Sequence, residues 1–552
     1  MDILTLKTST KKKQINEIKK QQALIFCLVL SILSGFLLGL SFPPYIFSPF
    51  LVVAFLPLLI VNELAVRNQI SYKMTFLCSW LAFIVWNIIV SYWLYNTVII
   101  PVVLLHLINP LFFAIIFTLF RVVYQKIGKN IAFFTLFTLW LSFEFLHHRW
   151  ELAYPFMTLG NGLAKSIQWI QWYEYTGVLG GSFWILLLNI VAYKIIESIF
   201  LSNNRQENMK LAYNYIRLWL AIFLFPLLFS YFLFYQYKEQ GRQANILIIH
   251  PNTDCYTEKY NQNSETLTKQ YIQQIKQVIK PTTNFVILPE TAITDAGFYG
   301  KLQDNKSLQI CQSLLKQYPN TKIISGAIVY QYADKSNAVR EPNLNYAKEY
   351  DYWYYAYNVA LQLDSSNHID LHCKQHLVPF EERIPYTHVF GKLKNIIAKL
   401  GFWHFETNIN YQNTFTAQAG NIVPLVCFES LFGESTAKAV RQDGEAIVVM
   451  LNEGWYNNQT GAAQFMHYAS LRAIENRRCV VRSSNYGFSC FINQRGEITT
   501  SINERKTDSI EQNIYLNNSK TFYTQYGDWV GKLACFGLLA VCLYFVYRIL
   551  FT

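Results

Sequence analysis

Ile422–Ser430 reads IVPLVCFES, an apolar run that ends at Cys427 and carries Glu429 two residues later. A short apolar run bounded by turn signals is typical of a buried strand. The end of a strand fixes a sulfur in place, and the turn after it offers backbone N–H groups to a developing oxyanion. Because most cysteines are simply small buried hydrophobes, the interpretation of Cys427 as a nucleophile depends on the groups that the rest of the chain supplies.

Two further segments supply the groups that a cysteine nucleophile needs. Phe285–Leu288 is a second apolar run, and a proline and Glu290 follow it. Lys374 comes shortly after the strand-like run 358–364 and ahead of a proline turn. A glutamate, a lysine and a cysteine, each beside a strand, meet the requirements for a base, an oxyanion stabiliser and a nucleophile.

The composition indicates a membrane protein with a large water-exposed part. Of the 552 residues, 52% are hydrophobic and only 15% are charged, which is too apolar for an ordinary soluble protein. The apolar residues form long blocks before about residue 240, then a mixed region extends to about residue 525, and one last apolar block follows. The length also exceeds that of one ordinary domain.

Eight of these blocks are long enough to span a bilayer, which takes ~20 apolar residues each. Buried core helices of a soluble protein would not explain eight such blocks in one chain. The first block is long, has no small-residue cleavage site and precedes more spans, so it is not interpreted as a cleavable signal peptide. The predicted spans lie near 24–40, 47–64, 74–97, 99–124, 130–147, 180–200, 212–236 and 531–550.

The basic residues predict which side of the membrane each loop faces. Lys and Arg gather in the cytoplasmic loops of membrane proteins. Here they precede span one and follow spans two, four and six, whereas the connections after spans one and three contain almost none. We therefore expect both termini in the cytoplasm and the mixed region on the opposite side. The net charge of +12 is partly this signal, and no nucleic-acid partner is expected because no nucleic-acid motif occurs.

The ten cysteines form no CxxC pair and no metal-ligand spacing, so no metal site is predicted. Six of them lie in the predicted extracytoplasmic region, where a disulfide is an open alternative. If Cys427 is a nucleophile, it must stay free in that compartment.

The mixed region predicts an α/β domain, because strand-like runs alternate with stretches of helical spacing. The predicted strands are Ala244–His250, Phe285–Leu288, Lys322–Tyr330, Asn358–Asp364, Ile422–Val426 and Ala446–Leu451, and the predicted helices are Ser264–Ile279, Lys306–Tyr318 and Ala462–Asn476. The chain is thus divided into a basic cytoplasmic N-terminus (1–22), a seven-span membrane domain (23–240), a catalytic domain (241–525) and a C-terminal transmembrane helix (526–552).

Three segments together resemble the signatures of the nitrilase superfamily. They are Leu288-Pro289-Glu290, Lys374 in the run KQHLVPF, and Val426-Cys427-Phe428-Glu429. The fuller match, over nearly the whole chain, is to the apolipoprotein N-acyltransferase family, which joins a membrane bundle to an extracytoplasmic nitrilase-like domain and a final span. His376–Phe380 followed by Glu382 is especially close to that family. The sequence departs from the family pattern at Asn452–Tyr456 and at Glu381, where a glycine is common.

The resemblance implies a polytopic α-helical membrane bundle joined to an extracytoplasmic α/β domain of the αββα nitrilase type. It implies acyl transfer from a phospholipid, through a thioester on Cys427, to the N-terminal amine of a diacylglyceryl-cysteine lipoprotein, with no cofactor. Glu290 is the implied base, and Lys374 with the N–H of Phe428 would hold the oxyanion. A base is useful because a free thiol has a pKa of ~8.5 and is mostly unionised at neutral pH.

Further expectations concern the surroundings of this triad. Glu382 is the expected fourth residue, which orients Lys374 or the amine, with a solvated carboxylate as the alternative. Glu429 is likewise either a structural partner near the nucleophile or a carboxylate without such a role. His376 is interpreted as a packed, hydrogen-bonded histidine. The family implies a bacterial inner membrane as the location, with the catalytic domain on the periplasmic side and a monomeric protein.

Two features relate the site to the membrane. Val389–Trp403 has apolar residues at helical spacing interrupted by three lysines, a pattern typical of a helix on a membrane surface. We interpret it as a lid over the site, with a helix packed on its own domain as the alternative. Glu144 is an ionisable residue in an apolar span, which marks a functional-site candidate. The nearby His147, His148 and Arg149 instead favour an ion pair at the interface.

Two rival functions share parts of this pattern. A membrane-tethered amidase or nitrilase acting on a small C–N substrate would keep the triad but would need neither a lid nor a lipid. A transporter with an inert outer domain would need charged residues paired within the bundle and would not need Cys427. Only Glu144 supports the transporter, so it ranks last.

Overall fold

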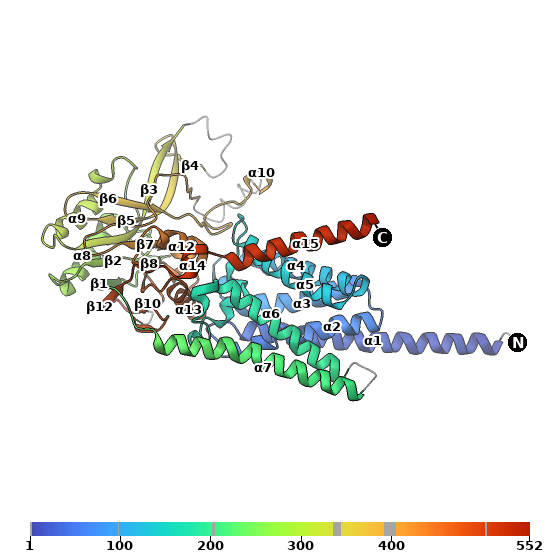
Figure 1. Cartoon of the computed structure of the whole chain (residues 1–552). Helices are drawn as coiled ribbons and strands as arrows, with labels where there is room; N and C mark the ends of the chain where they lie inside the picture. Colours follow the sequence, from blue (N-terminus) through green and yellow to red (C-terminus); the bar gives the residue numbers. More distant parts are fainter. Residues whose placement is uncertain are drawn as a thin grey trace.

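The computed structural model describes residues 3–97, 99–200, 205–334, 344–390, 404–502 and 505–551. A bundle of long helices carries an α/β domain at one end, and both chain termini lie at the other end (Figure 1). Within those ranges, eight helices are long and apolar enough to cross a membrane, and they match the eight predicted spans. Termini on the same side are what an even number of spans requires.

The bundle packs the last span of the chain against a much earlier one. Its helices are α1 (Ile3–Leu40), α2 (Leu56–Arg67), α3 (Tyr72–Ser91), α4 (Ile99–Lys126), α5 (Lys129–His147), α6 (Tyr173–Phe200), α7 (Arg205–Gln236) and α15 (Trp529–Phe551). α15 approaches α5 closely at Gly531, where a Cβ atom would lie 2.5 Å from the ring of Phe145. Small residues permit such close helix contacts in membranes.

The α/β domain is built on two sheets. The larger sheet has the order β12-β1-β2-β3-β5-β4, with β6 also paired to β5, and the smaller has the order β11-β10-β9-β8-β7. Its strands are β1 (Arg242–His250), β2 (Phe285–Ile287), β3 (Lys322–Ala333), β4 (Asn345–Ala347), β5 (Tyr352–Leu363), β6 (Ile369–Cys373), β7 (Ile422–Val426), β8 (Ala446–Leu451), β9 (Val480–Ser484), β10 (Ser489–Ile492), β11 (Ile498–Ile502) and β12 (Asp508–Leu516).

The two sheets pack face to face between two layers of helices. Ile246 and Ile248 of β1 belong to the core between the sheets, whereas Leu247 and Ile249 belong to the core under α8 (Ser264–Val278) and α9 (Lys306–Leu315). This alternation follows from the two-residue period of a strand. α12 (Gly433–Arg441) and α13 (Gln459–Asn476) cover the smaller sheet. The predicted αββα domain beside a membrane bundle is confirmed.

The strands that precede Glu290 and Cys427 occupy different positions in their sheets. β2 is central, paired in parallel with β1 and β3. β7 is an edge strand whose only neighbouring strand in the described structure is β8, although its first residue, Ile422, also forms an isolated bridge with Phe415. An edge position explains how β7 accommodates Pro424, because a proline cannot donate to a second neighbouring strand.

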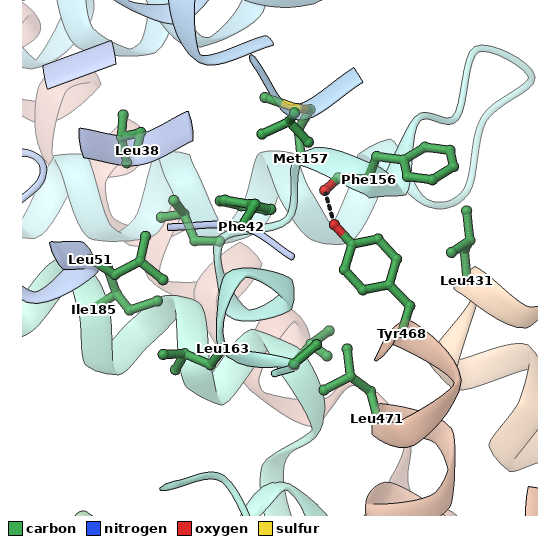
Figure 2. Close-up of a cluster of buried hydrophobic side chains, with 14 of the residues drawn as sticks. Leu38, Phe42, Leu51, Phe156, Met157, Leu163, Ile185, Leu431, Tyr468 and Leu471 are labelled. Atoms are coloured by element: carbon green, nitrogen blue, oxygen red, sulfur yellow. Dashed lines mark hydrogen bonds between the residues drawn. The ribbon is translucent and has the colours of Figure 1, made fainter. Parts of the chain in front are cut away.

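One apolar core joins the bundle to the α/β domain (Figure 2). Phe42 and Leu51 come from the end of the bundle that carries the α/β domain, and Phe156 and Leu163 come from the segment between α5 and α6. They share this core with Leu431, just after Cys427, and with Leu471 of α13. Tyr468 of α13 also donates a hydrogen bond to the carbonyl of Phe156, at 3.2 Å.

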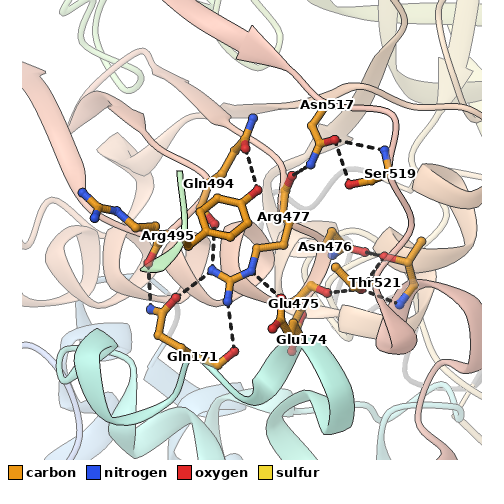
Figure 3. A network of polar contacts seen from close by, with 12 residues as sticks. Gln171, Glu174, Glu475, Asn476, Arg477, Gln494, Arg495, Asn517, Ser519 and Thr521 are labelled. Carbon is orange, nitrogen blue, oxygen red and sulfur yellow. Dashed lines mark hydrogen bonds and ion pairs between the residues drawn. The ribbon is translucent and has the colours of Figure 1, made fainter. Parts of the chain in front are cut away.

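A buried polar network fastens the same junction on another side (Figure 3). Arg477, which ends α13 in a left-handed conformation at φ 50°, donates to the Glu174 carboxylate at 2.6 Å and to Gln171 Oε1 at 2.6 Å. Both acceptors lie at or just before the start of α6. The α/β domain is therefore attached to the bundle by apolar packing and by buried charged contacts.

Candidate active site

Glu290 follows the central strand β2 in a tight turn. Its side chain is almost fully buried, and the next residue, Thr291, has a positive φ of 47°. The turn is tied to β3 because the N–H of Gly326 donates to the carbonyl of Pro289 at 3.1 Å. A Cβ atom on Gly326 would lie only 2.5 Å from the Cα of Glu290. The absence of a side chain at Gly326 is what lets this turn lie directly against β3.

Replacing Gly326 with alanine is therefore expected to displace Glu290. The added methyl meets backbone atoms of Pro289, Glu290 and Thr291 at 2.5–2.7 Å, and these cannot swing aside as a flexible side chain would. Overpacking of this kind destabilises by about 1–3 kcal/mol, and a shift of a reacting group lowers activity by about 10²-fold. Thermal unfolding and acylation assays on the purified variant measure both effects; unchanged activity would contradict this role of Gly326.

Lys374 stands directly after β6 and brings its ammonium between two carboxylates. Its Nζ lies 3.2 Å from Glu290 Oε1 and 2.7 Å from Glu382 Oε1, and only 1% of its side chain is exposed. Burial alone would lower the pKa of Lys374, but Glu290 and Glu382 raise it well above its ordinary value. Lys374 is therefore a permanent cation at this position.

Asn358 joins the same two carboxylates from β5. Its Nδ2 donates to Glu290 Oε1 at 2.9 Å and to Glu382 Oε1 at 3.2 Å, while its carbonyl accepts from the N–H of Lys374 at 2.9 Å. Glu382 is held further by the N–H of Val378, which donates to Oε2 at 2.8 Å. The structure thus brings three predicted residues, Glu290, Lys374 and Glu382, into direct contact.

Sequence reasoning missed Asn358 and also missed Lys259. The Lys259 side chain is fully buried, and its Nζ donates to the carbonyl of Glu290 at 2.7 Å. Burial lowers the pKa of Lys259 to about 8. The available signal for Asn358 was an amide inside a mostly apolar strand, since a buried polar side chain needs specific partners.

Cys427 is the first residue after β7 and begins the short 3₁₀ turn Cys427–Leu431. Its φ is 51°, a left-handed conformation that a side-chain-bearing residue rarely adopts and that clusters at functional sites. Burial raises the pKa of the Cys427 thiol well above its ordinary value; the charge of Glu290 adds to this effect and that of Lys374 opposes it. Cys427 is therefore a neutral thiol that needs a base before it can act as a nucleophile.

Glu429 connects the Cys427 turn to the Lys374 segment. Its Oε2 accepts from the N–H of Val426 at 2.8 Å, and its Oε1 accepts from the N–H of Gln375 at 2.7 Å. The third partner is His372, whose Nε2 lies 3.1 Å from Oε2. Burial would raise the pKa of Glu429, but His372 and the two backbone donors lower it. Of the two alternatives for Glu429, the geometry corresponds to the structural partner.

A cavity of about 790 Å³ lies between the α/β domain and the adjoining end of the bundle. Gln375 and Phe428, the chain neighbours of Lys374 and Cys427, line it, whereas Glu290, Lys374 and Cys427 do not. Phe428 and Phe432 line it on the domain side, and Arg149 and Trp150 line it on the bundle side. His376 lines it too, stacked on Phe432 at 3.7 Å between ring centroids and bonded to Ser435 Oγ at 2.7 Å. The interpretation of His376 as a packed, hydrogen-bonded histidine is confirmed.

The expected ion pair of Glu144 is wrong. Glu144 Oε1 accepts from Trp140 Nε1 at 2.9 Å and from the N–H of Leu159 at 2.9 Å. Arg149 instead pairs with Glu434 of α12 and with Asp528, which directly precedes α15. The segment 148–172 folds back over the end of α5 and brings the N–H of Leu159 to Glu144, while the second donor, Trp140, lies four residues earlier on the same helix.

The proposed lid, Val389–Trp403, lies outside the described residues except for its first two positions. At the two departures from the family pattern, Glu453 is buried and ion-paired with Arg482, and burial raises the pKa of Glu381 to about 7. All ten cysteines fall in the described ranges and are free. No group of three or more His, Cys, Asp or Glu suited to a metal occurs among the described residues.

Comparisons with known proteins cover almost the whole chain. Residues 34–191 match the profile described as the apolipoprotein N-acyltransferase N-terminal domain, and residues 242–521 match that of the carbon-nitrogen hydrolases. An apolipoprotein N-acyltransferase of Chlorobaculum tepidum is 25% identical over 93% of this chain and 95% of its own. One of Thermotoga maritima is 24% identical over 94% of each chain. The solved structure of Saccharomyces cerevisiae Nit3, a nitrilase-superfamily member, covers 53% of this chain and 97% of its own, with 16% identity and a TM-score of 0.35.

Proposed function

This chain belongs to the apolipoprotein N-acyltransferase family within the carbon-nitrogen hydrolases, and we propose that it carries a fatty acyl chain from a phospholipid to a lipoprotein through a thioester on Cys427. The acceptor is the N-terminal amine of a diacylglyceryl-cysteine lipoprotein. The observation that carries the proposal is the buried cluster in which the Lys374 ammonium lies between the Glu290 and Glu382 carboxylates, next to a strand-end cysteine.

The first half of the reaction forms the thioester. Glu290 takes the proton from the Cys427 thiol, and the thiolate attacks the ester carbonyl of the phospholipid. Lys374 and the N–H of Phe428 stabilise the tetrahedral oxyanion. The carbon–oxygen bond then breaks, and Glu290 returns the proton to the departing lysophospholipid alcohol. The products of this half are a Cys427 thioester and a lysophospholipid.

The second half transfers the acyl group to nitrogen. The neutral amine of the lipoprotein attacks the thioester carbonyl, and Glu290 accepts a proton from the attacking nitrogen. The carbon–sulfur bond breaks, and the proton passes to the leaving thiolate, which restores the Cys427 thiol and leaves an amide. Glu382 stays bonded to Lys374 throughout, which keeps the ammonium aimed at the oxyanion.

The place of the cavity supports a lipid donor rather than a small soluble substrate. It lies at the junction with the bundle, bordered by Phe428, Phe432 and Trp150. It contains the cationic side chains of Arg383, Lys438 and Arg441 besides Arg149, which is paired with Glu434 and Asp528 of the same lining. Apolar walls suit an acyl chain, and basic groups suit a phosphate. With the positive-inside pattern, this supports a bacterial inner membrane location with the site on the periplasmic side.

The intact mass of the purified full-length protein tests the proposed function. After incubation with phospholipid vesicles, we expect the mass to rise by one fatty acyl group, which peptide mapping assigns to Cys427. A synthetic diacylated lipopeptide is expected to remove the group and to gain it as an amide. Loss of the group to water, with no transfer to the lipopeptide, would instead support a hydrolase.

A further inference from the structure

His372 is a buried histidine that the proposed mechanism does not use. It lies on β6 opposite Ala360 of β5, two residues before Lys374, and only 4% of it is exposed. Both of its ring nitrogens have partners. Nδ1 lies 2.9 Å from the carbonyl of Gln412, and Nε2 lies 3.1 Å from Glu429 Oε2.

These partners fix the protonation of the ring. A carbonyl oxygen only accepts hydrogen bonds, so Nδ1 carries a hydrogen. Glu429 Oε2 already accepts from the N–H of Val426, and Oε1 accepts from the N–H of Gln375. A carboxylate surrounded by donors is ionised, so Nε2 also carries a hydrogen. The pair is then a buried imidazolium and a carboxylate.

We propose that His372 is a positioning residue of the acylation site: as an imidazolium it holds Glu429 in the orientation that ties the Cys427 turn to the Lys374 segment. The link is short on both sides. Val426 directly precedes the nucleophile, and Gln375 directly follows the oxyanion cation. The inference rests on the proposed function, because it assigns Cys427 and Lys374 the roles given there.

The strained backbone at Cys427 explains why such a link is needed. A left-handed residue with a side chain persists only where its surroundings hold it, and Cys427 has a φ of 51°. The Glu429 carboxylate accepts a hydrogen bond from Val426, which precedes Cys427, and Ser430 Oγ donates to the carbonyl of Cys427 at 2.8 Å. Without the third donor, Glu429 has a lone pair facing the lone pair of a neutral ring, and the carboxylate is free to turn.

Few other ionisable groups face the pair. The Tyr411 ring meets His372 edge-on at 5.7 Å between centroids, and among the described residues Cys373 and His376 are also close enough to interact with the charge of Glu429. Burial raises the pKa of Tyr411 and of Cys373, so both stay neutral around pH 7. Burial would lower the pKa of His372, but Glu429 raises it above 6.5. The imidazolium is therefore present below that value and is lost as the pH rises through the raised pKa.

The test compares three full-length variants with the parent protein. His372→Leu removes both donors, and His372→Gln keeps a donor that does not titrate. His368→Leu is the matched control, because His368 also pairs with a carboxylate, Asp370 at 2.9 Å, but its side chain is 65% exposed. The readouts are the rate of acyl-adduct formation on Cys427 with phosphatidylethanolamine–phosphatidylglycerol vesicles, by intact mass, and the thermal midpoint, both from pH 5.5 to 9.

His372→Leu is expected to slow adduct formation about 10- to 100-fold. The change should appear in the acylation rate at saturating lipid and not in the lipid concentration needed for half-maximal rate. His368→Leu is expected to behave as the parent. His372→Gln should retain more activity and should lack the alkaline decline that the parent shows. Equal rates for His372→Leu and the parent, or the same pH profile in His372→Gln, would overturn the inference.

The design separates this inference from the proposed function. If the parent protein forms no adduct, the proposed function fails, and the thermal midpoints still test the ion pair. The parent is then expected to exceed His372→Gln in midpoint at pH 5.5 and to lose that advantage as the pH rises to 9. A difference that stays constant across this range would show that the ring is not ionised and would refute the inference.

Discussion

Cys427→Ala is expected to abolish the acyl adduct and all transfer to a lipopeptide. The acyl-transfer rate is expected to fall at least about 10⁴-fold, because without the nucleophilic thiol no thioester can form. Alanine keeps a Cβ atom at the same left-handed position, so the strain at φ 51° is unchanged and the fold is expected to persist. Intact mass before and after incubation with lipid measures the loss directly.

Cys427→Ser serves as the companion variant for this experiment. A serine hydroxyl is far less acidic than a thiol, so any adduct forms much more slowly, and it is an oxygen ester. Neutral hydroxylamine should release the acyl group from the parent protein, which carries a thioester, and leave an ester on the serine variant. An adduct that persists on Cys427→Ala would place the chemistry on another residue.

Lys374→Met is expected to lower both activity and stability by large amounts. The parent ammonium lies 3.2 Å from Glu290 and 2.7 Å from Glu382, with 1% of its side chain exposed. Its loss leaves two buried carboxylates that share only the Asn358 amide between them. Breaking a buried ion pair in this way costs about 3–5 kcal/mol. Loss of an oxyanion donor alone lowers the rate by about 10²–10³-fold.

The sign of the pH effect in Lys374→Met follows from the same contacts. Two unpaired carboxylates in one site favour protonation, so the destabilisation is greatest at neutral pH and shrinks as the pH falls. Adding Glu382→Gln to Lys374→Met should recover part of the stability but none of the activity. Lys322→Met is the matched control, since Lys322 pairs with Asp364 at 2.8 Å in the same sheet, away from the site. Equal losses in Lys374→Met and Lys322→Met would contradict the role given to Lys374.

The sequence predicted the parts of the molecule that repeat simple patterns. Span-length apolar blocks correspond to the eight long helices, and the apolar runs at Phe285–Leu288 and Ile422–Val426 correspond to β2 and β7. Glu290 and Cys427 were accessible to sequence reasoning because both stand directly at the ends of such runs. β9 was not predicted, because it is short and carries Arg482, whose burial depends on pairing with Glu453 in a distant turn.

The contacts between segments were beyond reach of the sequence. Asn358 bridges Glu290 and Glu382, which are 68 and 24 residues away from it. Glu144 was assigned to its helical neighbours because i, i+3 and i, i+4 spacing is the only proximity that a sequence displays. One of its two donors, Trp140, is such a neighbour, but the other, Leu159, reaches it only because the segment after α5 folds back over the helix end. Chain reversals of this kind are set by tertiary packing.

The core that joins the bundle to the α/β domain also affects the order in which the protein can fold during translation. Trp93 bonds to Gln464, a residue that lies 371 positions later, and Tyr468 reaches back 312 positions to Phe156. The first seven helices are therefore synthesised before α13, and the apolar surface that α13 will cover is still exposed at that stage. Long sequence separations delay folding and leave apolar surface exposed in the meantime. We therefore expect this apolar surface to stay uncovered by α13 until translation has nearly finished.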